Sequence, residues 1–297
     1  MEGGFLAPLT APITKLIESL SLGVSGATKP WQIKRVAEAE ADAKLIHAEA
    51  DGAVLSIHDR AKARREALDA ARQANLEAVA AYAAEALPES VSSVPVDRAW
   101  MSKFLRHAED AFDQEMRSVW GRILAGEVEE PGSFSRRTLE QVGMLNKSDA
   151  EQFANLCRFG TDQPCLLVID LHNASYRKLD SPEFGDLVHL DNIGLIRFDP
   201  RANFTSEEEL GSDVASETKS RRILYRERAI DVQYNDFVTE RRGSCVVKSV
   251  YTGQAVFAAT GIELRQIVDT SFDPNVAEYL CNVLGKFSLA KFDESLE

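Results

Sequence analysis

Small and hydrophobic residues recur at helical spacing through a long stretch, residues 32–87. The stretch contains no proline and a single glycine, Gly52, so nothing in its composition ends a helix. At 1.5 Å per residue it would run for roughly 80 Å, far longer than an ordinary globular helix. The apolar stripe passes through Ala43, Ile46, Ala50, Val54, Ile57, Ala61, Leu68, Ala71, Leu76, Val79 and Tyr82. A helix of this length needs a partner, so the pattern predicts assembly with another chain or with a second part of the same chain.

Alanine occupies many positions of this stripe, which permits two helices to approach closely but buries little area. The pattern therefore favours a tight helical pair or bundle over a leucine zipper. Charged residues of both signs cover the other faces and indicate a solvated surface.

A shorter amphipathic pattern precedes the long one, with Ile13, Leu16, Ile17 and Leu20 at helical spacing after Pro12. One interpretation is a peripheral membrane contact through residues 5–22, although Lys15 is its one basic side chain. The interpretation that we favour is docking of this helix on the protein's own core or in an oligomer interface.

A second amphipathic pattern begins at Asp97, which can cap a helix, and carries two tryptophans and many apolar residues as far as Leu124. Shorter helices are predicted over residues 136–145 and 149–158. The first half of the chain is therefore expected to be all-helical.

The pattern changes near Gly160, where short apolar runs typical of strands begin. Strands are predicted over residues 165–170, 222–234, 244–251 and 255–259, and a polar, acidic stretch at 199–220 predicts a mobile loop. Helices are predicted to end near Leu190 and to follow Thr260 and Pro274. The fold class is thus α+β, with a winged-helix-like second half. The expected divisions are an N-terminal segment and linker over residues 1–30, a helical assembly domain over 31–159 and the α+β domain over 160–297.

Composition narrows the function classes. The net charge is −13 without a basic tract, which argues against nucleic-acid binding over the whole surface. The four cysteines are widely spaced, which favours reduced thiols in a cytoplasmic protein. The sequence predicts neither a secretory signal nor a membrane-spanning segment.

The densest motif reads Val119-Trp-Gly-Arg-Ile-Leu-Ala-Gly-Glu127, followed by Pro131-Gly-Ser-Phe-Ser-Arg-Arg-Thr-Leu139. Together with the preceding alanine-rich helix and the later block Val256-Phe-Ala-Ala-Thr-Gly-Ile-Glu-Leu264, it resembles the uncharacterised bacterial family domain of unknown function 2806. That family has kinship to abortive-infection-alpha-type proteins. The resemblance implies a bacterial cytoplasmic protein with a link to phage defence, and it implies no known reaction.

The motif also has a physical interpretation as a helix corner. Trp120 and Leu124 lie one turn apart and are expected to pack together, and Gly121 and Ala125 leave a groove for a close helix. Gly126 is expected to end the helix before the turn at Pro131. The alternative is that Arg136 and Arg137, at the next helix start, contact an anionic ligand or partner.

A metal site is a weaker hypothesis. Asp170 and His172, and likewise His189 and Asp191, place a carboxylate and an imidazole two residues apart. If all four met, they would suit zinc or manganese. The common phosphate-loop, dinucleotide, serine-hydrolase and zinc-protease motifs are missing from the sequence, so no catalytic residue and no cofactor is predicted.

We therefore expect a non-enzymatic interaction protein that forms a homo-oligomer and binds a protein partner. Ile46, Val54, Ile57 and Leu68 are predicted contact residues of the assembly, together with the helix-corner motif. Three alternatives stay open: a DNA-linked regulator that uses the winged-helix-like half, a membrane-associated effector, and a metal-dependent hydrolase.

Overall fold

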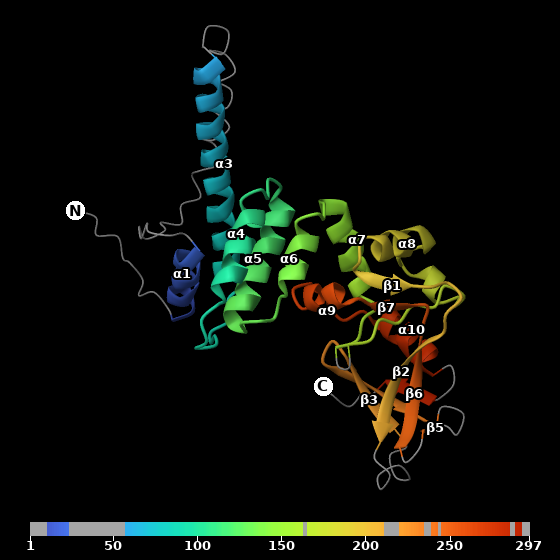
Figure 1. Ribbon diagram of the computed structural model, residues 1–297. Coiled ribbons are helices and arrows are strands. Elements are labelled where there is room, and N and C mark those ends of the chain that lie inside the picture. The colour runs from blue at the N-terminus through green and yellow to red at the C-terminus, as the bar shows by residue number, and fades with distance from the viewer. Residues whose placement is uncertain are drawn as a thin grey trace, which may run out of the picture. The chain divides into compact units, whose positions relative to one another are not determined.

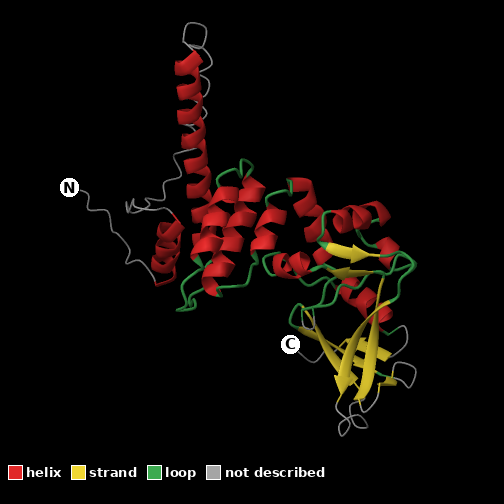
Figure 2. Ribbon diagram, in the orientation of Figure 1, coloured by secondary structure: helices red, strands yellow, loops and turns green. Residues whose placement is uncertain are grey.

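The computed structural model describes residues 11–23, 57–162, 165–210, 220–234, 239–242, 245–285 and 289–292 (Figure 1). The described chain is α+β, as the sequence predicts, and its strands belong to the second half (Figure 2). It divides into two compact units, Met1–Lys147 and Ser148–Glu297. This division precedes the expected one at residues 159 and 160, because Phe153 of helix α7 (Lys147–Cys157) packs edge-on against Phe257, with 6.3 Å between the ring centroids.

The first unit is built from helices that share one apolar core. They are α1 (Ala11–Gly23), α3 (Ile57–Ala86), α4 (Arg98–Ala108), α5 (Gln114–Glu129) and α6 (Arg136–Val142). Helix α3 packs along α5, and α1 packs on α4 and α5. Buried side chains at the centre of this unit include Val79, Trp100, Met101, Phe104, Trp120, Ile123, Leu124, Val128 and Leu139.

Helix α3 has 30 residues, and at 1.5 Å per residue it is about 45 Å long. Its buried residues are confined to the C-terminal half, from Asn75 to Ala83. The N-terminal half extends beyond α4, α5 and α6 (Figure 1). Residues 57–86 of the predicted long helix are thus helical, whereas residues 24–56 lie outside the described residues.

Helix α1 covers the predicted segment at residues 12–22. Its side chains Leu16 and Leu20 are only 3% and 4% exposed, so they are part of the core of the first unit. The described part of this segment therefore docks on the protein's own core, which is one of the two arrangements that we favoured from the pattern. No helix among the described residues has the length and apolarity needed to cross a membrane.

The apolar pattern that begins at Asp97 forms two helices rather than one. Asp97 caps α4 by accepting a hydrogen bond from the Trp100 amide at 2.8 Å. Asp113 does the same for α5 through the Met116 amide, also at 2.8 Å. The second cap starts a new helix within the pattern, because an aspartate that binds the backbone ahead of it competes with helix continuation.

Among the described residues, the second unit combines short helices with three small sheets. Its helices are α7, η1 (Tyr176–Lys178), α8 (Phe184–Asn192), α9 (Ala259–Arg265) and α10 (Pro274–Leu284). Its strands are β1 (Ile196–Phe198), β2 (Phe204–Leu210), β3 (Ser220–Tyr225), β4 (Arg228–Gln233), β5 (Thr239–Arg242), β6 (Cys245–Gly253), β7 (Ala255–Phe257) and β8 (Leu289–Phe292). The sheet orders are β1-β7, β2-β6-β5 and β3-β4-β8, and all of their pairings are antiparallel.

The prediction of a mobile loop over residues 199–220 is wrong for the central part of that range, which forms β2. This strand pairs with β6 along its length, from Phe204 opposite Gly253 to Leu210 opposite Val246. Exposure alternates from Phe204 to the exposed Glu207, as in a strand with one face in solvent. Thr205 and Glu207 therefore lie on the solvent side of an outer strand, so this part of the acidic stretch is not a loop. Residues 211–219 lie outside the described residues.

Two other predicted strands differ from the structure. The strand expected over residues 222–234 is the hairpin of β3 and β4, which turns at Arg226 and Glu227. The run expected as a strand at 165–170 forms only isolated bridges, at Leu167 and Ile169.

The side chain of Tyr279, on α10, supplies hydrogen bonds to that run which a second neighbouring strand would otherwise supply. Its hydroxyl accepts a hydrogen bond from the Asp170 amide at 2.8 Å and donates one to the Val168 carbonyl at 3.2 Å. Its ring packs against those of Phe159 and Tyr176, with centroids 5.8 and 5.3 Å away. This aromatic cluster forms the buried centre of the second unit.

Candidate interaction surface

The helix-corner motif fixes α3 against α5. A Cβ atom added at Gly121 would lie 2.4 Å from the Tyr82 Cβ and 3.0 Å from the Ala83 backbone nitrogen. The two helices therefore touch where α5 has no side chain. The structure thus puts α3 in the groove that the sequence predicts beside Gly121.

Trp120, the residue before Gly121 on α5, packs against α4. Its ring packs edge-on against Phe104, with 5.5 Å between centroids, and stacks on His107 at 5.9 Å. Leu124 and Ala125 are also buried. These motif residues thus build the core of the first unit.

The corner itself depends on a buried carboxylate. Helix α5 does not end at Gly126 but runs on to Glu129, and Gly126 leaves room for the ring of Phe134. Glu127 is 2% exposed and accepts hydrogen bonds from the Gly132 and Phe134 amides at 2.8 and 3.1 Å. The sequence interpretation missed this role, because a glutamate on a helix normally indicates a solvent-exposed position.

The Phe134 carbonyl accepts a hydrogen bond from Trp100 Nε1 at 2.7 Å. Ser135 then caps α6 through the Thr138 amide at 3.2 Å. Arg136 and Arg137 are exposed in the first turn of that seven-residue helix.

The apolar stripe of α3 continues past the part that the first unit covers. Seen down a straight helix, Leu68, Ala61 and Ile57 lie within about 40° of the buried Val79, at roughly 100° per residue. Ile57 is nevertheless 78% exposed and Leu68 is 40% exposed. We call residues 57–71 the arm. Ile46 and Val54, the other predicted contact residues, lie outside the described residues.

Polar contacts hold α3 where the arm leaves the core. The Arg72 guanidinium pairs with the Asp110 carboxylate at 2.9 Å, and Asn75 Nδ2 donates to the Glu109 carbonyl at 2.9 Å. The turn between α4 and α5 is thus tied to the base of the arm, so the direction of the arm is set within the first unit.

A second exposed apolar feature lies on α8. Phe184 and Val188 are 53% and 36% exposed and lie one turn apart on the same face of the helix. The Phe184 ring packs edge-on against Phe198 at 5.4 Å. We call Phe184 and Val188 the α8 ridge.

The four weak metal candidates do not converge. His172 Nδ1 lies 3.7 Å from Asp170 Oδ1 and contacts the Gln254 amide at 2.7 Å. His189 Nε2 lies instead 2.6 Å from Asp149 Oδ1. Asp191 accepts a hydrogen bond from the Phe198 amide. In the part of the chain that the structure describes, no cluster of three or more histidine, cysteine or acidic side chains suits a metal ion.

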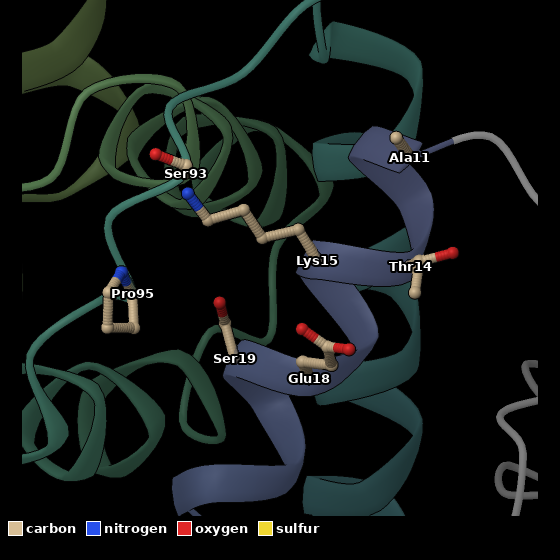
Figure 3. Close-up of a pocket in the computed structure, with 7 residues that line it drawn as sticks. All are labelled: Ala11, Thr14, Lys15, Glu18, Ser19, Ser93 and Pro95. Carbon is tan, nitrogen blue, oxygen red and sulfur yellow. The ribbon is translucent and has the colours of Figure 1, made fainter.

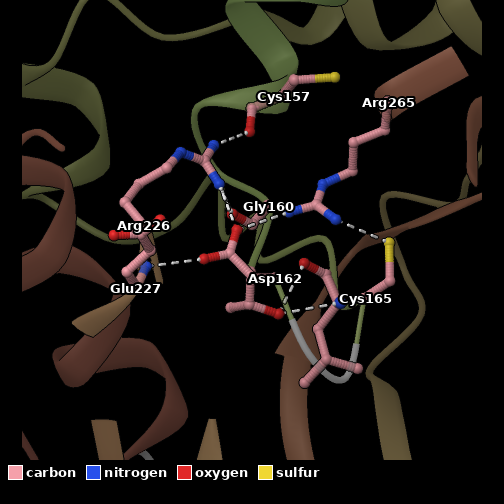
Figure 4. A network of polar contacts seen from close by, with 9 residues as sticks. Cys157, Gly160, Asp162, Cys165, Arg226, Glu227 and Arg265 are labelled. Carbon is pink, nitrogen blue, oxygen red and sulfur yellow. Dashed lines mark hydrogen bonds and ion pairs between the residues drawn. The ribbon is translucent and has the colours of Figure 1, made fainter. Parts of the chain in front are cut away.

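A partly buried polar network joins the β3–β4 turn to the end of α7 (Figure 4). Arg226 Nη1 donates to Asp162 at 2.8 Å and its Nη2 donates to the Cys157 carbonyl at 2.8 Å. Arg265 reaches the same carboxylate at 3.2 Å and the Cys165 sulfur at 3.2 Å. Burial raises the pKa of the Cys157 thiol to about 12, so this thiol stays protonated.

The network holds a strained turn in place. Arg226 and Glu227 both have positive φ, 51° and 66°, a conformation that costs of order 1–2 kcal/mol for each non-glycine residue. The hydrogen bonds to Asp162 offset this strain, which gives the network a structural role.

A cavity of about 470 Å³ lies beside α1 (Figure 3). Lys15 and Glu18 line it from α1, and Ser93 and Pro95 line it from the segment before α4. Lys15 Nζ donates to the Ser92 carbonyl. Burial lowers the pKa of the Lys15 amine below its ordinary value. The contact between Lys15 and Ser92 ties α1 to the segment before α4.

Comparison with known proteins identifies a family. A family model described as a protein of unknown function, DUF2806, matches residues 59–281. Because the match spans more than half of the 297 residues, the chain belongs to this family. No curated protein and no solved structure matches the chain.

Proposed function

We propose that this member of the DUF2806 family is a non-enzymatic interaction protein that forms a homo-oligomer through the arm of α3. The observation that carries the proposal is the exposed stripe of the arm. It prolongs the face that α3 buries on α5, yet Ile57 and Leu68 are exposed.

Physical reasoning supports a partner for the arm. Most helices gain their stability from packing one face. The arm continues the packed half of α3, but none of its own residues is buried. Its stripe contains Ala61, which allows a second helix to come close. Leu68 and Ile57 supply the apolar area that such a contact would bury.

Light scattering after size exclusion tests the proposal on the full chain. We compare the wild type with Leu68→Glu and with Ala70→Glu, a matched control on the opposite, exposed face of the same helix. A defined oligomer that Leu68→Glu dissociates and Ala70→Glu does not is the expected result. A monomeric wild type, or an oligomer that Leu68→Glu leaves intact, would overturn the proposal.

We propose in addition that the predicted helix extends back through residues 32–56, and that the second unit is a winged-helix-like module that docks a protein. Helix α8 leads into β1, which pairs antiparallel with β7 just before α9, and this arrangement of helices and strands supports that description. The sequence of α8 contains two aspartates and no lysine or arginine, which favours a protein over DNA. Salt-sensitive DNA binding by the full chain would contradict this preference.

The cytoplasm and abortive-infection-like anti-phage defence are the setting that we propose, supported by the resemblance of the helix-corner motif and the late block. In a bacterial host challenged with a phage panel, the wild type and Ala70→Glu should reduce plaque formation, and Leu68→Glu should not. Equal plaque counts with and without the wild type would refute the proposed role in defence, and the assembly proposal would be unaffected.

Membrane action receives less support, because Leu16 and Leu20 are already buried within the first unit. We expect no flotation of the full chain with anionic liposomes.

A further inference from the structure

The exposed face of the arm is basic. Seen down the helix, Arg64 and Arg65 lie about 60° and 40° to either side of Val79, and Leu68 lies between them. Both arginines are exposed. The acidic side chains of the arm lie at about 80° or more from Val79 in the same projection; they are Asp59, Glu66 and Asp69. A helix that covers the stripe therefore meets one arginine along each edge of the contact.

The two arginines disfavour pairing of one arm with another arm. A parallel pair in register would put Arg64 of one copy beside Arg65 of the other, and an antiparallel pair centred on these residues would put each beside its own counterpart. Like charges that meet across an interface cost free energy. A suitable partner for the arm therefore has acidic edges.

Residues 36–50, which lie outside the described residues, have such edges in a helical projection. We call them the upstream segment. If the helix continues straight back from the arm, as we propose, Glu40 lies about 60° to one side of Val79 and Asp42 about 100° to the other. Lys44, the one lysine or arginine of the segment, is also about 100° away. The apolar stripe continues through the segment within about 60° of Val79, as Val36, Ala39, Ala43, Ile46 and Ala50.

We infer that the arm of one copy packs antiparallel on the upstream segment of a second copy. This inference rests on the proposed self-assembly and names what covers the arm. A straight helix carries the upstream segment away from the arm of its own chain, so the arm that it covers belongs to another copy. When the two helices cross near residue 53, Arg64 lies near Asp42 and Arg65 lies near Glu40, which makes the charges complementary on both edges.

The same alignment matches the sizes of the side chains along the stripe. Each large side chain falls opposite an alanine, in the pairs Leu68 with Ala39, Ile57 with Ala50 and Ile46 with Ala61. Rows of side chains on one helix then fit between those of the other, so the two helices approach closely along the whole contact.

Each copy supplies one arm and one upstream segment, so the contact is made twice around a two-fold axis. A contact of this isologous kind closes on itself and gives a dimer rather than a filament. The paired helices span residues 36–71, which is roughly 50 Å at 1.5 Å per residue.

A charge exchange tests the contact. The double variant R64E/R65E makes the edges of the arm acidic, and E40R/D42R makes those of the upstream segment basic. Each variant alone should associate at least about tenfold more weakly than the wild type at low salt, because like charges then meet in both contacts. An equimolar mixture should assemble again, because in a heterodimer each acidic edge faces a basic one. Glu66→Arg, a charge reversal far from the stripe, is the matched control and should associate as the wild type does.

Sedimentation velocity measures each variant and the mixture, and circular dichroism checks that each variant is folded. Hydrogen exchange on the wild type, at low and high protein concentration, gives a measurement that needs no variant. Concentration-dependent protection of residues 36–50 and 57–71 together is expected.

The outcomes separate the inference from the proposal beneath it. If Leu68→Glu dissociates the oligomer but E40R/D42R leaves it intact, self-assembly stands and the upstream segment is not the partner of the arm. A mixture that stays dissociated, or a wild-type assembly larger than a dimer, also contradicts the inference. A monomeric wild type overturns both, and protection of residues 36–50 and 57–71 at every concentration would then mean that the segment folds back on the arm of its own chain.

Discussion

Gly121 is the position where the packing of the first unit can be tested most sharply. The change is Gly121→Ala, which adds a single methyl group to α5. That carbon would lie 2.4 Å from the Tyr82 Cβ, whereas carbon atoms in contact are normally about 3.5–4.0 Å apart. The neighbouring atoms belong to or adjoin the α3 backbone, so a side-chain rotation cannot relieve the clash.

The magnitude follows from two opposing effects. Alanine in a helix interior is more favourable than glycine by about 1 kcal/mol. Overpacking a well-filled contact costs typically about 1–3 kcal/mol, and here two helices must separate by more than about 1 Å. Because both the clash and the lost packing around Val79 and Ala83 add to the cost, we expect a net destabilisation of about 1–2 kcal/mol.

Urea unfolding followed by tryptophan fluorescence measures the change, since Trp100 and Trp120 are buried within this unit. The matched control is Gly185→Ala, monitored by far-UV circular dichroism. Nothing lies within 4 Å of the added carbon there, so a gain of up to about 1 kcal/mol is expected. A Gly121→Ala protein as stable as the wild type would refute the close contact between α3 and α5.

Three further predictions concern other buried or paired groups. Glu127→Ala should destabilise the first unit by about 2–4 kcal/mol, because two amides lose their acceptor, and the exposed Glu129→Ala should change the urea midpoint little. The hydrogen bond from Lys103 lowers the pKa of Glu140, so their pairing stabilises the fold above about pH 4.5 and is lost as the pH falls; the difference in urea midpoint between wild type and Glu140→Gln should shrink from pH 7 to pH 3. Burial raises the pKa of Cys157 to about 12, so this thiol should resist a maleimide at pH 8 until the protein is unfolded, as mass spectrometry of the labelled peptides would detect.

Local signals in the sequence predicted the helices well. Asp97 forms the cap that its position indicates, and most of the tryptophan-rich stripe, including Trp100 and Trp120, is buried as its period requires. The same local reasoning missed the break at Asp113, because the apolar period continues across it while the cap interrupts the backbone. A helix cap inside a periodic apolar segment is hard to recognise from sequence, because tertiary contacts decide whether the helix continues or a new helix begins there.

The second unit was less predictable, because its defining contacts join residues far apart in sequence. Arg226 reaches Asp162, and Arg265 reaches the same carboxylate from yet another element. Neither arginine differs from a surface arginine in its local pattern. The acidic strand β2 was missed for a related reason, since its identity depends on the pairing with β6 rather than on its own composition.

Only part of the candidate interaction surface could be predicted from the sequence. Ile57 and Leu68 were recognisable as members of a helical stripe, but the pattern could not show that the core covers Val79 and leaves Leu68 in solvent. The α8 ridge gave no signal at all, because Phe184 and Val188 resemble core residues in the sequence.

The hydroxyl of Tyr279 has a consequence for the order in which the protein folds. It completes the hydrogen bonding of Val168 and Asp170, although it lies more than one hundred residues later in the chain. During synthesis the first unit can close as soon as its last helix leaves the ribosome, whereas the second must wait for α10. Its apolar interior therefore stays uncovered for longer, and contacts of such high sequence separation form slowly. We expect nascent chains that stop before residue 279 to hold a protease-resistant first unit joined to a protease-sensitive second one.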